Sequence, residues 1–537
     1  MISKEEKVQY RSELFRHLDG IAIAPVAFRL HEKGITQQLL SKRNHNLREL
    51  TKLYNANDGY LNVALRLLAS QGWIDYHVDN STNEVAVLVN EKSGIAFSMF
   101  EYYKMAVDFL ELSRTFHPRK SNPADFYKIQ RILEDFQNPK SFESIKSKDP
   151  EIQNQIKKHI EGAICGPLTV ALAMNGFFHK YFMEASFRAG EYHEDPESFS
   201  KILDFYTHLQ WFTKKENTYR FTEKGLFFAK RASAYGVTVS YIPTFNNIED
   251  LLFGDFSSLR ETSKNKAEIH VDRVMNVWGS GGAHTTYFRQ IDNIIIEIFN
   301  KPIEEQPKGI LDMGCGNGAF LIHLFDVIEQ RTLRGTMLED YPLFLVGADY
   351  NKEALKVTRA NLVNADIWAK VIWGDIGNPE QLEKDIFEDY AIHLNDLLNV
   401  RTFLDHNRMW SEPNEKITKN SSTSTGAFAF RGKKLSNKEV ELNLKEHFMK
   451  WEPFINKFGL LLIELHTLPP EISSKNIGKT AVTAYDATHG FSDQYIVELD
   501  VFLRVIKEIG LKSIPENFSQ YPDSDIATVS IHYIKGN

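Results

Sequence analysis

The sequence predicts an α/β protein in which a Rossmann-like core follows mainly helical, winged-helix-like domains. Three observations support this fold class. From Lys308 onward, short apolar segments alternate with amphipathic ones, as expected for a largely parallel sheet covered by helices. Glycines at alternate positions follow Asp312, at the end of the first of these apolar segments. A pattern of helices followed by a hairpin occurs near the N-terminus and again farther along the chain.

Length and composition limit the possible classes of protein. A chain of 537 residues is too long for one hydrophobic core, and its 42% hydrophobic and 25% charged residues are typical of a globular protein. The net charge of −8 disfavours nucleic acid as a partner. Two isolated cysteines, Cys165 and Cys315, fit a reducing cytoplasm. No apolar run is long enough for a membrane span, so we expect a soluble protein.

The sequence divides into five regions. Residues 1–110 are expected to form a winged-helix-like domain, with helices at 21–30, 47–54 and 60–70 and a hairpin over 73–89. Residues 111–160, which contain four scattered prolines, are interpreted as a helical connector. Residues 161–245 are expected to form a second winged-helix-like domain, residues 246–305 a helical lead-in, and residues 306–537 the α/β core.

The second winged-helix-like unit has its own start signals. We expect it to begin at Gly166-Pro167, and Asp195-Pro196 supplies an N-cap and a first-turn proline for its third helix. The segments around Trp73 and Trp211 are alike, which leaves both internal duplication and chance similarity open.

Winged helices often bind DNA, but the residues here argue against it. The helix that would enter a major groove has only Arg66 as a basic residue in the first unit. In the second unit, Lys201 is offset by Glu197 and Asp204. We therefore expect these units to form a homodimer contact or a lid over an active site.

Six strands are expected in the α/β core, over Gly309–Met313, Leu343–Ala348, Ala369–Trp373, Tyr390–Leu394, Leu460–Leu465 and Thr528–Tyr533. The polar segment Ser411–Val440 separates the fourth strand from the fifth. It is interpreted either as a solvated loop or as a mobile cover over the site.

The glycine-rich loop is the first motif with chemical content. Gly314, Gly316 and Gly318 let the backbone turn tightly and approach a ligand at a helix N-terminus. The spacing differs from the dinucleotide fingerprint, because the next strand-ending acid, Asp349, lies 37 residues after Asp312. A third acid, Asp375, ends the third strand.

This series of motifs resembles the class I methyltransferases. The resemblance implies that the glycine loop holds the methionine part of S-adenosylmethionine, that Asp349 binds the ribose hydroxyls, and that Asp375 reaches the adenine. We assign Tyr350, Ile376 and Asp396 to the same cofactor site. The alternative, turn aspartates without a ligand, is disfavoured by the combined spacing.

Four further motifs are more specific: Asn276–His284, Val400–Arg408, Leu462–Thr467 and Tyr485–Tyr495. Together they resemble the metal-dependent C-methyltransferase domain of polyketide loading modules, of the apratoxin type and related to the one at the head of the saxitoxin pathway. The resemblance implies methylation of the α-carbon of a malonyl group on the phosphopantetheine arm of an acyl carrier protein. The chain departs from those assembly lines because it shows no carrier motif, so we expect an enzyme that acts in trans.

His489 and Gln494 are the candidate metal ligands. They lie five positions apart in a segment that contains glycine, close enough to bind one divalent ion, iron or alternatively manganese. Two alternatives stay open for His489: a general base that removes the α-proton, or a hydrogen-bonded loop histidine. Tyr485 and Tyr495 could orient the thioester carbonyl or could simply pack.

Several residues and functions remain open. His284, His406 and His466 are not assigned as ligands, because each could be a satisfied structural histidine. The basic run Arg431-Gly432-Lys433-Lys434 could meet an acidic carrier protein or could be a solvated loop. A small-molecule O-methyltransferase with winged-helix dimerisation domains is the alternative enzyme, and a silent binding module of an assembly line is the alternative outside the enzymes.

Overall fold

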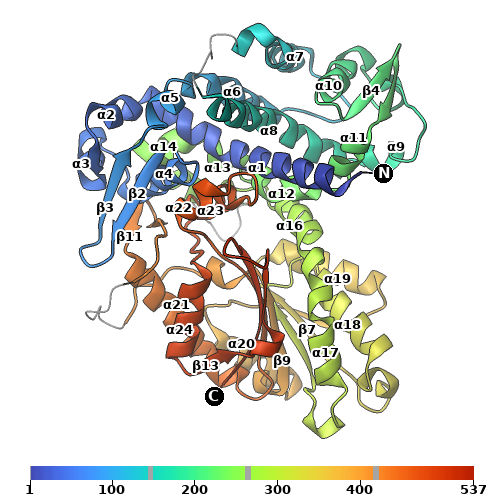
Figure 1. Cartoon of the computed structure of the whole chain (residues 1–537). Helices are drawn as coiled ribbons and strands as arrows, with labels where there is room; N and C mark the ends of the chain where they lie inside the picture. The colour runs from blue at the N-terminus through green and yellow to red at the C-terminus, as the bar shows by residue number, and fades with distance from the viewer. Residues whose placement is uncertain (1, 143–148, 261–267, 415–421, 537) are drawn as a thin grey trace.

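The computed structural model describes residues 2–142, 149–260, 268–414 and 422–536. Figure 1 shows a helical block, coloured from blue to green, above an α/β block coloured from yellow-green to red. The expected fold class is confirmed. Among the described residues, no helix is both long and apolar enough to span a membrane.

Two long helices form the centre of the helical block. α1 (Lys4–Glu32) packs along α8 (Pro150–Met174) at a very close crossing. A Cβ atom on Gly20 would lie 2.3 Å from the Cα of His159, and one on Gly162 would lie 2.3 Å from the Cα of His17. Only glycine permits this approach at both points. The expected helix over residues 21–30 is therefore one part of a much longer helix.

The first helix-and-hairpin unit is found where the pattern indicated. It contains α3 (Leu47–Tyr54), α4 (Asp58–Ser70), β2 (Ile74–Asp79) and β3 (Glu84–Val89). A short strand, β1 (Asn44–Asn46), completes its sheet by pairing with β3.

The second unit is built from α10 (Pro196–His208) and the hairpin β4 (Phe212–Lys215) and β5 (Thr218–Phe221). Asp195 caps α10 as expected, by accepting a hydrogen bond from the backbone of Ser198. Gly166 and Pro167, where this unit was expected to begin, lie inside the continuous helix α8. The long apolar packing of α8 on α1 outweighs the hydrogen bond that an internal proline removes.

The α/β block contains a mixed sheet with the order β13-β15-β12-β9-β6-β7-β8. The parallel strands are β6 (Gly309–Met313), β7 (Phe344–Asp349), β8 (Lys370–Trp373), β9 (Leu397–Thr402) and β12 (Leu460–Leu465). Antiparallel strands follow at one side: β15 (Val529–Gly536), β13 (Leu511–Ser513) and β14 (Ser519–Tyr521).

Helices cover both faces of this sheet. α17 (Asp292–Phe299) and α18 (Ala319–Arg331) share one buried apolar cluster with it. α20 (Pro379–Tyr390), α21 (Asn437–Ile455) and α24 (Leu499–Glu508) share the other. Both layers are visible in Figure 1. α19 (Lys352–Asn364) packs on β7 and β8.

The fourth expected strand, Tyr390–Leu394, is wrong. Residues up to Tyr390 complete α20, and the strand is β9, which begins at Leu397. This shift moves Asp396 from the end of a strand to its beginning. Its carboxylate pairs with Lys308 and Lys457, both at 2.8 Å. These pairs lie at the end of the strands opposite the glycine loop. Asp396 therefore does not lie with the other acids assigned to the cofactor.

The helical block contacts the α/β block through the segment between β12 and α24. This segment contains α22 (Pro470–Lys475) and α23 (Val482–Gly490), and both helices pack on the helical block in Figure 1. α23 contacts both α1 and α4. The helix that carries His489 is thus held between the two blocks.

The segment Ser411–Val440, expected to be a solvated loop or a mobile cover, is largely hydrogen-bonded to and packed against neighbouring elements. Residues 415–421 lie outside the described residues. The backbone of Ser424 accepts hydrogen bonds from Asn80 and Asn437, and the hairpin β10 (Phe428–Phe430) and β11 (Lys433–Leu435) packs on α4.

Candidate active site

Three glycines shape the loop after β6. Gly314, Gly316 and Gly318 have φ angles of +80°, +56° and +79°, in the left-handed region that favours glycine. Gly318 directly precedes α18, so the loop presents the N-terminus of that helix. The turn is closed by the backbone of Gly314, which donates to the carbonyl of Ala348 on the neighbouring strand at 2.7 Å.

Asp312 is the most unusual carboxyl group of this loop. Its side chain is buried, and neither carboxylate oxygen has a hydrogen-bond partner among the described residues. Burial, and secondarily the charge of Asp349, raises the pKa of Asp312 to about 8. A buried acceptor without a partner is costly unless a ligand supplies a donor or a positive charge. The loop therefore fits a cationic ligand.

Asp349 ends β7 beside the same loop. Its carboxylate accepts backbone hydrogen bonds from Gly316 at 3.0 Å and from Asn351 at 2.8 Å. These bonds hold the carboxylate in place, although burial raises its pKa. Asp349 thus connects the second strand to the glycine loop, and it ends that strand as the sequence predicted.

The third strand contributes side chains at the same end of the sheet. The rings of Tyr350 and Trp373 lie 5.4 Å apart and are both exposed beside Asp349. Asp375 accepts a hydrogen bond from the backbone of Gly377 at 2.8 Å, and Ile376 is buried. These four residues line one side of the strand ends, where a flat aromatic group could stack.

His489 and His406 form a buried pair at the carboxyl ends of the central strands. Their ring centroids are 4.8 Å apart. The Nδ1 atom of His489 donates to the backbone carbonyl of Tyr485 at 2.6 Å, and that of His406 contacts Glu464 at 2.6 Å. Neither Nε2 atom has a hydrogen bond among the described residues. Burial, and then the charge of His406, lowers the pKa of His489 to about 3, so its imidazole is neutral.

Glu464 is positioned by the end of β12. Its carboxylate also accepts hydrogen bonds from the backbone of Asp405 at 2.9 Å and of Leu465 at 2.7 Å. A buried carboxylate fixed by three donors holds the His406 ring in one orientation. The sequence did not identify this pair, because the two residues are 58 positions apart and only the β9–β12 pairing joins them.

Gln494 lies on the same side of this site as His489. Its backbone donates to the carbonyl of His489 at 3.0 Å, which closes the turn between the two residues. Its side-chain Nε2 donates to the hydroxyl of Tyr241 at 3.3 Å. The amide oxygen of Gln494 is therefore the atom left for another partner. The two residues expected as ligands are thus in backbone contact.

The two candidate tyrosines differ in their surroundings. Tyr495 is buried, its backbone donates to His406 at 2.8 Å, and its hydroxyl has no hydrogen-bond partner among the described residues. Burial raises the pKa of Tyr495, so the hydroxyl stays protonated and can donate. Tyr485 contributes its backbone carbonyl to His489, and its ring packs against the core.

The remaining motif histidines lie elsewhere. His466 is buried and hydrogen-bonds to Ser530 at 2.6 Å, which continues to His532 at 2.7 Å. Burial lowers the pKa of His466 to about 4. This series of hydrogen bonds satisfies polar groups inside the sheet. The motif around His284 forms α16 (Arg273–Phe288), but the side chain of His284 lies outside the described residues.

The helical block fixes α23 with buried polar contacts. Arg66 on α4 pairs with Asp486 and donates to the hydroxyl of Thr467 at 3.0 Å. Asp19 on α1 accepts a hydrogen bond from the backbone of Ala484 at 3.2 Å. These bonds hold the turn of α23 that precedes His489. They are a structural contribution that the sequence did not reveal.

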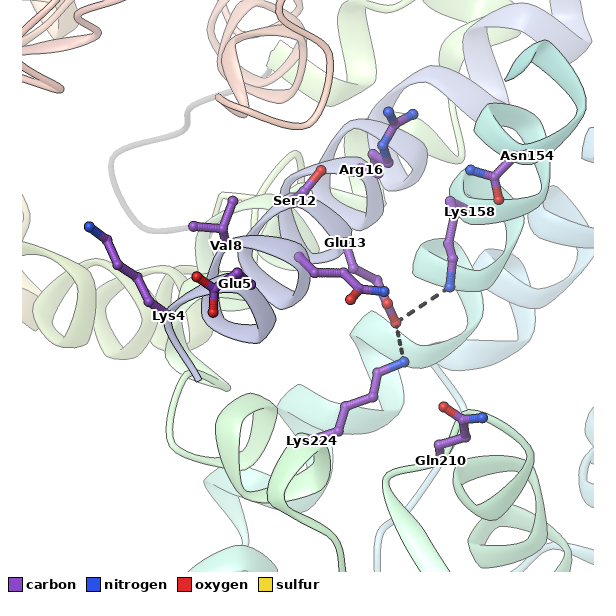
Figure 2. Close-up of a pocket in the computed structure, with 11 residues that line it drawn as sticks. Lys4, Glu5, Val8, Ser12, Glu13, Arg16, Asn154, Lys158, Gln210 and Lys224 are labelled. Atoms are coloured by element: carbon purple, nitrogen blue, oxygen red, sulfur yellow. Dashed lines mark ion pairs between the residues drawn. The ribbon is translucent and has the colours of Figure 1, made fainter. Parts of the chain in front are cut away.

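A second group of possible ligands lies inside the helical block. Ligand atoms of Glu13, His17 and Glu161 lie within 4.8 Å of one another. Lys224 pairs with Glu13 at 2.7 Å, and Lys158 pairs with Glu161 at 2.8 Å. Figure 2 shows Glu13 between the two lysines, beside an open pocket of about 940 Å³. Because two cations already balance the two carboxylates, this group fits an ion network that joins helices and not a metal site.

Comparison with known proteins identifies the domains. A family model described as the AprA MT2-like domain matches residues 268–532. Models described as the AprA winged helix domain and the AprA N-terminal domain match residues 161–255 and 10–76. No curated protein sequence matches the chain.

Solved structures with a similar arrangement include three methyltransferases. The mitomycin 7-O-methyltransferase MmcR covers 72% of this chain and 98% of its own, at 11% identity and a TM-score of 0.42. The CurJ carbon methyltransferase covers 80% and 100%, at 10% identity and a TM-score of 0.32. Human N-acetylserotonin methyltransferase in complex with SAM covers 73% and 99%, at 11% identity and a TM-score of 0.38.

The chain is therefore a class I S-adenosylmethionine-dependent methyltransferase with AprA-type domains. The apratoxin-type resemblance expected from the motifs is confirmed, as is the cofactor class. The assignment of Asp312, Asp349 and the glycine loop to the cofactor stays a prediction.

Proposed function

We propose that this methyltransferase transfers a methyl group to the α-carbon of a malonyl group that is carried by an acyl carrier protein, with the help of a divalent metal ion. One observation carries the proposal: two neighbouring buried imidazoles, His406 and His489, each have Nδ1 fixed by an acceptor, and neither Nε2 has a hydrogen bond among the described residues. One can bind a metal ion while the other accepts a proton, and both would assist carbon methylation of an activated acyl group.

The cofactor side is supported by the unpartnered carboxylate of Asp312 and the left-handed glycines of the loop. Asp312, Asp349 and the loop backbone would hold S-adenosylmethionine. When bound, the cofactor supplies an activated methyl group, so the chain's residues need only position it.

The metal side is supported by the donor atoms left open on α23 and the following turn. The Nε2 atom of His489 and the amide oxygen of Gln494 would hold the ion, and the mixed nitrogen and oxygen set suits iron, or manganese as the alternative. A histidine ligand normally donates its other ring nitrogen to a backbone carbonyl or a carboxylate, as His489 does to Tyr485. When bound, the ion supplies Lewis acidity toward the oxygens of the acceptor.

His406 is the group that would accept the α-proton. Its Nε2 atom is open, and Glu464 would stabilise the imidazolium that forms when the proton arrives. The hydroxyl of Tyr495, buried and unpartnered, would donate a hydrogen bond to the thioester carbonyl. Each of these residues acts from the same end of the sheet as the glycine loop.

A small-molecule O-methyltransferase is the second candidate, and the same His406–Glu464 pair supports it. A hydroxyl acceptor needs a base and no metal ion. Activity on free phenols without metal, together with no reaction on malonyl-carrier protein, would favour this alternative.

The experiment is an intact-mass measurement of malonyl-carrier protein after incubation with enzyme, S-adenosylmethionine and iron or manganese. We expect a gain of methyl mass that is lost with a chelator. Asp349→Ala should reduce it by weakening cofactor binding, whereas Asp396→Ala should not, because Asp396 lies at the opposite end of the strands. Full activity in a metal-free preparation would remove the metal from the proposal. No methyl gain under any of these conditions would remove the malonyl acceptor.

A further inference from the structure

A row of aromatic side chains leads from the active site to the surface of the α/β block. Tyr495 is buried next to His406, the ring of Trp410 lies 5.5 Å from it, and the ring of Phe430 lies 6.4 Å beyond Trp410. Trp410 and Phe430 are half-buried, and the neighbouring Met409 is 69% exposed. The row therefore extends from a buried tyrosine to partly exposed rings.

The three rings come from separate parts of the chain. Trp410 follows β9, Phe430 lies on the hairpin β10–β11, and Tyr495 follows α23. The hairpin is anchored from the other side, because a Cβ atom on Gly59 of α4 would lie 2.6 Å from the backbone of Lys433. The backbone of Gly59 also donates to Gly432 at 2.9 Å. The outer end of the row is thus held in a fixed position.

Arg431 stands at this outer end. Its guanidinium carbon lies 5.9 Å from the centroid of the Phe430 ring, and its side chain is exposed. One guanidinium nitrogen donates to the backbone carbonyl of Arg260 at 3.2 Å, and no other side-chain hydrogen bond of Arg431 is found among the described residues. An arginine that uses one guanidinium nitrogen in this way has other N–H groups that can bind a planar or tetrahedral anion.

The neighbouring lysines point in different directions. The side chain of Lys433 is exposed. The ammonium group of Lys434 donates to the backbone carbonyl of Asn83 at 2.9 Å, and burial lowers its pKa. The basic run, for which both a docking cluster and a solvated loop were expected from the sequence, is therefore divided. Arg431 and Lys433 are available to a ligand, whereas Lys434 holds the hairpin to the helical block.

We infer that this row is the binding path for a phosphopantetheine arm, with Arg431 and Lys433 at its phosphate and Tyr495 at its thioester. The inference rests on the proposed function and specifies how the acceptor reaches the site. The phosphodiester is an anion that can accept hydrogen bonds from an arginine guanidinium group. The methylene and amide groups between phosphate and sulfur can pack against a row of aromatic rings. The unpartnered hydroxyl of Tyr495 gives the thioester carbonyl a donor at the inner end.

The test measures binding of phosphopantetheine, and of pantetheine without the phosphate, by calorimetry with the full-length protein. We expect Arg431→Ala to weaken phosphopantetheine binding by about tenfold or more, with little change for pantetheine, because only the charged hydrogen bonds are lost. Arg431→Lys should recover part of the loss. Arg220→Ala, which removes an exposed arginine from β5 in the helical block, is the matched control and should leave both affinities unchanged.

Two results would overturn the inference: equal weakening of both ligands in Arg431→Ala, or no binding of phosphopantetheine to the wild type at millimolar concentration. A thermal melt of each variant checks that it is folded. The binding assay needs no methyl transfer, so its outcome is separate from that of the proposed function. Binding that depends on Arg431, without methylation of malonyl-carrier protein, would retain the path and reject the malonyl acceptor.

Discussion

The protonation of Asp312 links cofactor binding to pH. Its buried carboxyl group has a pKa of about 8 in the free protein. S-adenosylmethionine carries an ammonium and a sulfonium charge, and both favour an ionised carboxylate beside them. Binding should therefore release a proton when the pH is below 8, and affinity should rise with pH.

The size of the effect follows from the pKa. A ligand that requires the ionised form loses up to about tenfold in affinity for each pH unit well below the pKa. Because Asp312 is about half ionised at pH 8, affinity at pH 6 should be about 50-fold weaker than at pH 8. Burial also raises the pKa of Asp349, which acts in the same direction.

The stability of the cofactor-free protein should change in the opposite direction. A carboxyl group whose pKa is raised by folding stabilises the protein while it is protonated, and this stability is lost as the pH rises through the folded-state value of about 8. Asp312→Asn removes this loss. The cofactor-free variant should therefore melt higher than the wild type at pH 8, and the difference should vanish near pH 4.

The assay is titration calorimetry at pH 6, 7 and 8, in buffers with different heats of ionisation, so that released protons are counted. Asp312→Asn should bind more weakly at pH 8 and should lose the pH dependence that Asp312 contributes. A flat affinity without proton release in the wild type would refute the reasoning. An unchanged slope in Asp312→Asn would assign the titration to another group.

Three further predictions concern the rest of the site. Glu464→Gln should lower the rate of methyl transfer by about 10²–10⁴-fold in single-turnover assays, while cofactor binding is retained, because His406 loses the carboxylate that stabilises its protonated form; an unchanged rate would exclude this pair as the base. His489→Ala and Gln494→Ala should each lose metal, measured in anaerobically purified protein, but retain cofactor binding, whereas the surface variant His393→Ala should keep its metal. Asp349→Ala should weaken cofactor binding by about 1.5–3 kcal/mol, the scale of hydrogen bonds to a charged group, and an unchanged dissociation constant in a folded variant would remove Asp349 from the site.

The sequence predicted those elements whose apolar pattern is continuous. β6 and β12 have the expected bounds, because each is an uninterrupted buried run. β9 was displaced, because residues 390–402 contain two short apolar runs and only tertiary packing selects the second. The same error affected the assignment of Asp396 to the cofactor site, since that assignment depended on where the strand ended. Pro167 does not interrupt α8, for the same reason: tertiary packing of α8 on α1 maintains the helix.

The candidate site shows a similar division. Asp312, Asp349 and the glycines follow one another along successive strand ends, so a linear pattern could place them together. His406 and Glu464 meet only because β9 and β12 are neighbours in the sheet, which no local spacing reveals. The orientation of Gln494 depends on Tyr241, far away in the sequence, and the anchoring of α23 depends on Asp19 and Arg66.

These contacts give the helical block a part in the active site. The glycine loop belongs wholly to the α/β block, but α23 is held by buried partners from α1 and α4. Without the helical block, Asp486 would lose the guanidinium of Arg66, and breaking a buried ion pair typically costs about 3–5 kcal/mol. The turn that brings Gln494 to His489 would also lose Tyr60, which donates to Asp493 at 2.8 Å. In the proposed site, the donor side would therefore be built by one block, whereas the acceptor side would require both.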